Sequence, residues 1–471
     1  MTSSPTDSTE RIDPIRLVCL VALVASHGLV RLAERYLPEF LSALGYGPIV
    51  VGSLVTLGMG VAVVASDRSD NVSNDMATTL ETTATVVLST ALAAVGLFAW
   101  AGSPTLDTLL GTPLSALGWL ATGVVLLQAW YVGGPGRHLW PIDTRATAQT
   151  SGLSSAPADE SDGGDRSARR TATIDRRTRT VVGALGVAAA AVFATAAVAS
   201  ADTVGAGFAL IAATGAAVAL VGAVALGTVR DRSPLLGDRL RSGGGTNDER
   251  TNDGGANDAS LDADSSLTAF RDAVSRVPDR RRWAVIGDAL VRVATAGIAP
   301  FLILLVVEYR AIALSVGGLS LAPAAVFGLF VLTEAGGAVF GAIGAPALID
   351  HLDRRALLAA GLAGISLLPM AIIAAPPQAG VVAGLFGLLG CRTAIEPLRP
   401  TVGTSTRASP VPGSRLPEEI RTAVRIAIVP APLVGGILYA IDPLVAFTAA
   451  TTVGLLGVRE LGRAFTFGRH R

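Results

Sequence analysis

Hydrophobic and polar positions divide this chain into long apolar runs separated by polar segments. A helix needs about 20 mostly apolar residues to cross the hydrocarbon core of a membrane, and most of the runs are about this long. We therefore predict an all-α integral membrane protein. Its twelve membrane-spanning helices are expected at residues 17–40, 47–66, 79–101, 112–132, 180–200, 203–229, 283–307, 319–348, 356–375, 379–396, 422–440 and 443–458.

The second half of the chain repeats the pattern of the first. Residues 288–302 align with residues 27–41 without a gap, and both segments contain Leu-Val-Arg and Phe-Leu at the same positions. Farther along, residues 327–331 correspond to residues 51–55. Internal repeats of this kind are typical of secondary transporters, whose sites lie where the two repeats meet. We therefore expect two pseudo-symmetric bundles of six helices, at residues 17–229 and 283–458.

Polar segments set the remaining boundaries. Residues 1–16 and 459–471 are expected to be short tails, residues 133–179 an insert in the first bundle, and residues 230–282 a linker between the bundles. The insert and the linker are rich in Gly, Ser, Asn and Asp. Such segments cannot bury enough apolar surface to fold, so we expect both to be disordered.

Arginine is distributed unevenly along the chain. All 37 basic residues are arginine, and most lie in the tails and in the connections after even-numbered runs. Two others, Arg35 and Arg310, are expected on the opposite side. Because basic residues gather on the cytoplasmic side of membrane proteins, we predict a multi-pass protein of the cell membrane with both termini in the cytoplasm. The arginines within the runs are Arg31, Arg292, Arg392 and Arg425.

Composition excludes several classes of function. A phosphate-binding Walker loop and a Schiff base both need lysine, and the chain has none. The net charge of zero gives no electrostatic basis for binding nucleic acid. Cys19 and Cys391 lie in apolar runs and have no metal-ligand spacing. We therefore expect no enzyme, no cofactor and no metal. The expected protein is a monomer that interacts with membrane lipid and a small-molecule substrate.

Ionisable residues inside the runs are the candidates for function, because a charge within a membrane is costly and usually marks a polar pathway. The candidate ligands for a substrate or a coupling ion are His27, Arg31, Glu34, Asp288, Arg292 and Glu334. Desolvation favours the protonated form of buried acids, as proton coupling requires. Alternatively, Arg31 with Glu34 and Asp288 with Arg292 are internal ion pairs that only orient helices. Arg392 and Glu396 are expected to lie too near the membrane edge to bind substrate.

A charged turn between the eighth and ninth runs carries a family resemblance. Residues 348–355 read Leu-Ile-Asp-His-Leu-Asp-Arg-Arg, which resembles the cytoplasmic motif Gly-x-Leu-x-Asp-Arg-x-Gly-Arg-Arg of the major facilitator superfamily. The resemblance implies two six-helix bundles, alternating access, and a conformational gate that does not touch the substrate. In the first half the motif has shrunk to two residues. The implied gate residues are Asp67, Arg68, Asp350, Arg354 and Arg355.

Further likeness to archaeal efflux-type members lies around residues 287–292, 396–397 and 432–436. It implies a secondary active transporter, ion- or proton-coupled, and an efflux or antiport direction. The proline kink of the fifth helix and the arginine of the fourth helix in drug antiporters are absent. Two alternatives remain. One is a degenerate carrier that acts as a sensor, and the other is a polytopic Mg-dependent prenyltransferase with acidic loops at residues 67–75 and 350–353.

Overall fold

The computed structural model describes residues 14–72, 79–106, 109, 111, 115–133, 163–231, 279–400 and 418–466. In these ranges, eleven helices are long and apolar enough to cross a membrane, and Ala116–Val132 is a shorter apolar helix. Each of the twelve predicted runs therefore forms a helix or a chain of helical segments. The prediction of an all-α membrane protein is confirmed, apart from one short hairpin of β1 (Leu314–Val316) and β2 (Leu319–Leu321).

The first half of the chain consists of uninterrupted helices. Proline at the first position, which suits a helix start, begins α2, and Ser115 caps the N-terminus of the fourth helix by accepting from the Gly118 amide. The six helices are α1 (Pro14–Ala43), α2 (Pro48–Val72), α3 (Thr79–Gly102), α5 (Ala116–Val132), α8 (Gly163–Ser200) and α9 (Val204–Asp231).

Three spans of the second half are broken. Pro300 lacks an amide hydrogen and breaks the seventh span, which runs through α12 (Asp279–Ile298), η1 (Ala299–Phe301), α13 (Leu302–Leu304) and η2 (Leu305–Tyr309). The tenth span passes from α16 (Ala379–Gly390) into η3 (Cys391–Ala394) and η4 (Glu396–Leu398). Pro430 separates the two parts of the eleventh span. These are α17 (Glu418–Ile428) and α18 (Ala431–Ile441), and the continuous helices are α14 (Pro323–His351), α15 (Arg354–Ala374) and α19 (Pro443–Thr466).

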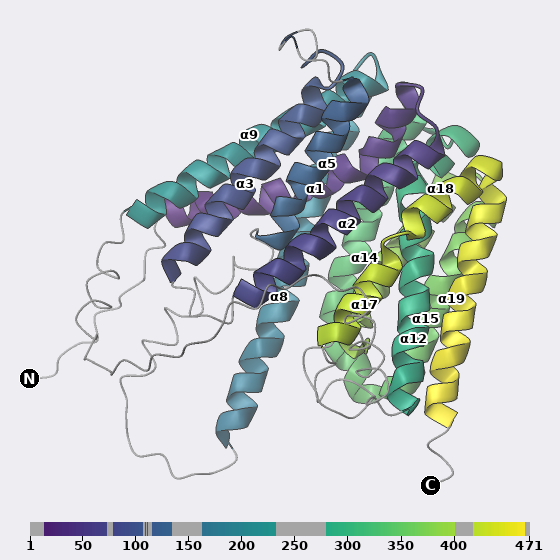
Figure 1. Ribbon diagram of the computed structural model, residues 1–471. Coiled ribbons are helices and arrows are strands. Elements are labelled where there is room, and N and C mark those ends of the chain that lie inside the picture. Colours follow the sequence, from purple (N-terminus) through teal and green to yellow (C-terminus); the bar gives the residue numbers. More distant parts are fainter. Residues whose placement is uncertain are drawn as a thin grey trace, which may run out of the picture.

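Helix packing repeats between the halves. The first helix packs on the sixth, as α1 on α9 and α12 on α19, and the second packs on the fourth, as α2 on α5 and α14 on α16. The first also crosses the fifth at a pair of glycines in each half, Gly28 with Gly186 and Gly297 with Gly435. The sequence repeat is thus also a repeat of structure, and the prediction of two pseudo-symmetric six-helix bundles is confirmed (Figure 1).

The two halves contact each other mainly through two helix pairs, α2 with α18 and α8 with α14. In each pair the second helix of one half packs on the fifth helix of the other. At the end where α1 stops and α2 begins, Gly52 lies against the Pro432 carbonyl and Gly436 against the Pro48 carbonyl. The Leu433 amide also donates to Thr56 Oγ1 over 3.1 Å. We call this the closed end. Toward the other end, the spread end, the ribbons of the two halves diverge (Figure 1).

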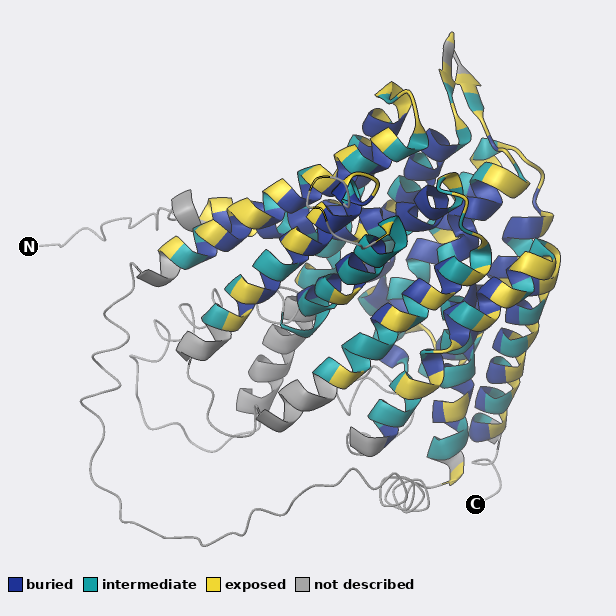
Figure 2. Ribbon diagram, turned by 45° about the horizontal axis from the view of Figure 1, so that its top comes forward, coloured by how far each residue is buried: buried dark blue, intermediate teal, exposed yellow. Residues whose placement is uncertain are grey.

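Buried residues lie on the helix faces turned toward other helices, and exposed apolar residues lie on the outer faces (Figure 2). The main core is aromatic at the interface between the halves, where Tyr36 packs edge-on against Phe327 and its hydroxyl donates to the Ala324 carbonyl over 2.8 Å. Since exposed apolar side chains on spanning helices face lipid, this pattern fits a membrane protein.

Some predicted boundaries are corrected. α8 begins at Gly163, inside the segment 133–179 that was expected to be disordered, because the helical pattern continues past the apolar run into its charged flank. In the same way α12 begins at Asp279, inside the linker, and α19 continues to Thr466, inside the C-terminal tail. Residues 134–162 and 232–278 lie outside the described ranges.

Candidate functional site

Three charged residues follow one another around a turn of α1. The Arg31 Nη1 and Glu34 Oε2 atoms are 3.7 Å apart, as expected for an ion pair three residues apart on a helix. Glu34 also accepts a hydrogen bond of 2.6 Å from the Tyr131 hydroxyl at the end of α5, and the Arg31 guanidinium lies 4.7 Å above the ring of that tyrosine. α1 and α5 thus hold one carboxylate and one guanidinium in fixed positions.

The third residue of that turn reaches across to the other half. Arg35 Nη2 lies 2.9 Å from Glu334 Oε1 on α14, and Arg392 Nη1 on η3 lies 3.3 Å from the same oxygen. One carboxylate is therefore shared by an arginine from each half. We call the whole set the central charge cluster. It consists of Arg31, Glu34, Arg35, Tyr131, Glu334 and Arg392.

The side chains of the central charge cluster differ in their exposure to solvent. The Glu334 side chain is 8% exposed, while the Arg31 side chain is 50% exposed. An arginine in the middle of a span cannot face hydrocarbon without a large energetic cost. Arg31 contacts Glu34 and Tyr131 of the first half and interacts electrostatically with Glu334 of the second. We therefore infer that its exposed side faces a space between the halves that contains water.

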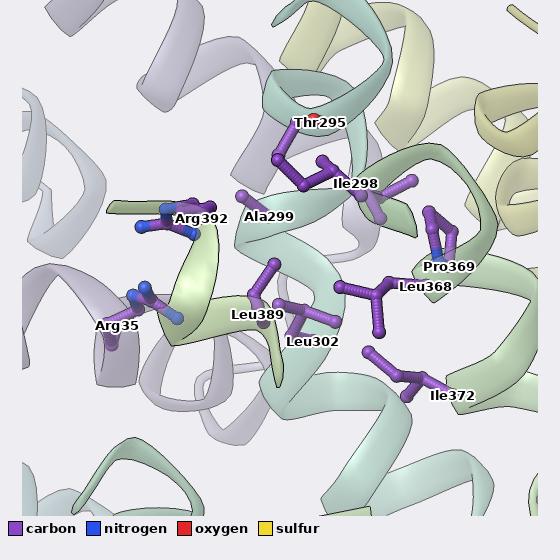
Figure 3. A pocket seen from close by; sticks show the side chains of 11 residues that line it. Arg35, Thr295, Ile298, Ala299, Leu302, Leu368, Pro369, Ile372, Leu389 and Arg392 are labelled. Carbon is purple, nitrogen blue, oxygen red and sulfur yellow. The ribbon is translucent and has the colours of Figure 1, made fainter. Parts of the chain in front are cut away.

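A small cavity of about 30 Å³ lies beside the cluster (Figure 3). Arg35 and Arg392 line one side of it, and the opposite side is apolar, with Leu302, Leu368 and Ile372. A water molecule needs at least about 10–15 Å³ of such volume, so the cavity holds on the order of two waters. In this conformation it is too small for an organic substrate.

The broken seventh span forms one wall of this cavity through Thr295, Ala299 and Leu302. Pro300 cannot donate a hydrogen bond to the carbonyl of Ala296, four residues before it. Broken helices at the middle of a membrane are typical of binding sites in transporters, because irregular backbone is tolerated there only beside protein or water. The cavity therefore combines charges from both halves with a helix that can bend.

Three of the six predicted candidates lie outside the central charge cluster, and two of them, Asp288 and Arg292, are paired with each other. Asp288 is fully buried, and its main partner is Arg399, whose Nε and Nη2 both lie 2.6 Å from Asp288 Oδ1. Arg292 Nε is 3.6 Å from Oδ2, so the predicted pair is present but secondary. Asp288 lies seven residues, about 10 Å, before Thr295 along α12, toward the spread end.

His27 lies one turn before Arg31 and stacks on Trp130 with ring centroids 6.5 Å apart. It contacts no carboxylate in the described part of the chain. The structure thus brings together only Arg31, Glu34 and Glu334 of the predicted ligands.

Two expectations about arginine are corrected. Arg392 was expected too near the membrane edge for a binding role, but η3 turns its side chain into the cavity. Arg35 was assigned to the outer connection, although it lies within the predicted run 17–40 and nine residues before the end of α1. Its position inside an apolar run could have identified Arg35 as a candidate site residue from the sequence. Its partner could not have been identified in this way, because Glu334 is 299 residues away.

The predicted gate residues lie at the spread end. Asp350 is exposed in the last turn of α14 and forms no ion pair with any residue that the structure describes. Arg355 is the second residue of α15, where its amide donates to the capping carboxylate of Asp353 over 3.1 Å, and its guanidinium lies 5.9 Å from the Phe465 ring. Arg354 is the neighbouring helical residue. The side chains of Asp67 and Arg68 lie outside the described residues.

A magnesium site finds no support in this arrangement. Asp353 caps α15 rather than facing a second acidic loop, and in the described ranges no group of three or more His, Cys, Asp or Glu could hold a metal ion. The prenyltransferase interpretation depended on two facing acidic loops, and the side chains of the first loop, residues 67–75, lie outside the described residues.

No family model matches the sequence, and no curated protein matches it. Solved structures match over nearly the whole chain. A POT family transporter in complex with 5-aminolevulinic acid is 11% identical, with a TM-score of 0.58, and the match covers 96% of this chain and 95% of that chain. The xylose transporter XylE from E. coli, in a partially occluded inward-open conformation, is 11% identical with a TM-score of 0.54 and coverages of 95% and 96%. The chain has the major facilitator fold.

Other solved structures with the major facilitator fold also match. The nucleoside transporter NupG is 12% identical, with a TM-score of 0.57 and coverages of 96% and 98%. The resemblance carried by residues 348–355 is thereby confirmed for the fold. These structures are transporters with different substrates, so the major facilitator fold by itself assigns no substrate to this chain.

Proposed function

We propose that this protein is a secondary active transporter that moves a small molecule across the cell membrane by alternating access. The observation that carries the proposal is the central charge cluster. It is built from residues of both halves, and one carboxylate at the place where the halves meet is shared by an arginine from each. A site of this kind is reached from one side or the other as two pseudo-symmetric bundles rock against each other.

The closed end is proposed to face the outside and the spread end the cytoplasm. An even number of spans returns the chain to the side on which it began, so both termini lie at the spread end. Many of the described arginines flank the spans at that end, among them Arg177, Arg281, Arg354 and Arg459. Basic residues flank spans on the cytoplasmic side, which supports this orientation and an inward-facing conformation.

The charge of the central cluster favours a substrate with an anionic group. Its three guanidinium groups outnumber its two carboxylates, and Arg35 and Arg392, which both pair with Glu334, line the cavity (Figure 3). Guanidinium groups bind carboxylate and phosphate in a bidentate manner. A substrate anion would take the place of the Glu334 carboxylate on one of these arginines, while the apolar wall of the cavity would hold its hydrocarbon part.

The experiment that tests the transport proposal is a screen of the purified protein in liposomes. Small carboxylates and phosphates would be loaded inside, and counterflow of the labelled compound or current on a solid-supported membrane would be measured with a pH gradient applied and removed. We expect counterflow for at least one anionic compound, and a current that changes with the gradient. Absence of counterflow and current for all compound classes would contradict transport.

Variants connect that activity to the site. Arg392→Gln removes one of the two guanidinium groups from the cavity, so we expect transport of the anionic compound to fall at least about tenfold, the equivalent of about 1.4 kcal/mol. Arg463→Gln is the matched control, because Arg463 pairs with Glu460 near the end of α19. Equal loss of transport in both variants would argue against a substrate role for Arg392.

The proposed transporter also has a conformational gate at the spread end, is coupled to an ion or proton gradient, and exports its substrate. We propose that Asp350 pairs with arginine only when the spread end closes, which fits its exposed position and its lack of an ion pair with any residue that the structure describes. Asp350→Asn is then expected to favour the inward-facing state without changing substrate affinity within either state. Ion or proton coupling and efflux are proposed on the resemblance, and the current screen tests both by reversing the gradient.

A further inference from the structure

The closed end holds a pair of acidic residues from opposite halves, which the central charge cluster does not include. Glu308 lies in η2 of the second half, and its Oε1 accepts a hydrogen bond from the Ser42 hydroxyl at the end of α1. Glu39 lies three residues before Ser42, on the same face of α1. The two carboxyl groups are close enough to interact electrostatically.

Glu39 is a buried acid with an unsatisfied carboxylate oxygen among the described residues. It is 6% exposed, and its Oε2 atom has no hydrogen-bond partner among the residues that the structure describes. The hydroxyl of Tyr439 on α18 is also buried without a hydrogen-bond partner among the described residues, and Tyr439 is 6% exposed. This hydroxyl interacts electrostatically with both Glu39 and Glu308.

No counter-charge reaches this pair in the described part of the chain. Arg35, one turn before Glu39, is bound to Glu334. Arg310, two residues after Glu308, donates to the carbonyl oxygens of Ile373 and Ala375 at the end of α15.

The other titratable groups around the pair carry no positive charge. They are the hydroxyls of Tyr36, which donates to the Ala324 carbonyl, of Tyr309 and of Tyr439. The closed end therefore places the buried Glu39 near the exposed Glu308, and no cation of the described ranges pairs with either.

We propose that Glu39 and Glu308 form a proton-binding site that fills when the closed end closes and empties when it opens. On closing, the buried Glu39 carboxylate takes a proton from water and becomes a neutral carboxyl group, whose O–H can donate to a neighbouring oxygen such as that of Tyr439. On opening, water reaches Glu39 and the proton returns to it. The site would be the coupling site of the transporter, and that part rests on the proposed function.

The physical reason is the difference in hydration between the two states. A carboxylate that is buried without a partner, beside a second carboxylate, is strongly disfavoured relative to its neutral form, whereas the same group in water is stable as an anion. The closed state thus binds one proton more than the open state. By linkage, closure is favoured at low pH, and the ratio of closed to open molecules falls by up to about tenfold for each pH unit in the range where Glu39 titrates.

The test measures closure directly and needs no substrate. Cys19 and Cys391 would be replaced by alanine, and spin labels would be placed at Ile49→Cys on α2 and Ile441→Cys on α18, which are exposed on opposite halves at the closed end. Distances between the labels would be measured in nanodiscs from pH 5 to pH 9. We expect the short-distance population to decrease as pH rises. In Glu39→Gln, which resembles the protonated acid, it should stay high at every pH.

Controls separate the possible outcomes. Glu460→Gln removes an acid near the far end of α19 and should keep the wild-type pH dependence. Glu308→Gln serves if Glu39→Gln does not fold, and should likewise lose the dependence. A wild-type distance distribution that does not change with pH would overturn the proposal, as would an unchanged slope in both Gln variants. Closure by sodium chloride but not choline chloride at constant pH would also overturn it. Failure of the transport proposal would appear separately, as absent counterflow with pH-dependent distances intact.

Discussion

At the scale of single residues, Asp288 shows how a fully buried acid is kept in a spanning helix. Its carboxylate is held by Arg399 and, more loosely, by Arg292. This network lies within the second half and apart from the cavity that Arg35 and Arg392 line. We therefore infer that Asp288 fixes the end of the tenth span to α12 and that it is not a substrate ligand.

The prediction for Asp288 concerns stability. Asp288→Asn leaves Arg399 buried without its counter-charge, and breaking a buried ion pair in this way costs about 3–5 kcal/mol. We expect a clear loss of thermal stability in detergent. The double variant Asp288→Asn with Arg399→Gln should recover much of the loss, because no uncompensated charge remains. A single variant that folds normally but abolishes gradient-driven transport would instead place Asp288 in the transport pathway.

At the scale of elements, the crossing of α2 and α18 depends on two glycines. A Cβ atom added at Gly52 would lie 2.5 Å from the Pro432 oxygen, and one added at Gly436 would lie 2.6 Å from the Pro48 oxygen. Both neighbours are backbone atoms, which cannot rotate away. The two helices can approach this closely only while both positions lack a side chain.

The prediction for this crossing concerns the equilibrium between conformations. Gly436→Ala should disfavour the closed end by about 1–3 kcal/mol, the usual range for overpacking, and so increase the population with a long distance between labels at residues 49 and 441. Gly364→Ala on α15 is the matched control, because a Cβ atom there meets nothing within 4 Å. If both variants left the label distances unchanged, the crossing would tolerate a side chain and the glycine would not be required.

At the scale of the whole molecule, the connections between spans report how the chain is oriented in the membrane. Asp202 and Gln378 are exposed in connections at the closed end, and His351 is exposed at the spread end. Ser103, another residue of an outer connection, is only 1% exposed and unsuited to labelling.

The topology prediction uses single cysteines in a chain that lacks Cys19 and Cys391. Asp202→Cys and Gln378→Cys should react with a membrane-impermeant maleimide in intact cells, and His351→Cys only after the cells are permeabilised. The expected order follows from the arginines that flank the spans at the spread end. Reaction at residue 351 in intact cells would reverse the orientation and place the proposed proton site at the cytoplasmic end.

The sequence by itself determined the spans, the repeat and the short-range ion pairs. Apolar runs of spanning length are a local property, so they gave all twelve helical spans. The pairs Arg31 with Glu34 and Asp288 with Arg292 were predicted because three- and four-residue spacings place side chains on one helix face. The major facilitator fold followed from the repeat together with the charged turn at residues 348–355.

Only the tertiary structure decided which charges meet. Glu334 is shared by Arg35 and Arg392, Arg399 lies 111 residues from Asp288, and Ser42, one turn after Glu39, donates to Glu308 of the other half. Spacing along a helix carries no information about these partners, because each pair joins helices that are distant in the sequence. The breaks at Pro300 and in η3 add to this, since they rotate residues away from the direction that an unbroken helix would give them. The location of the site between the halves therefore depends on how the repeats pack.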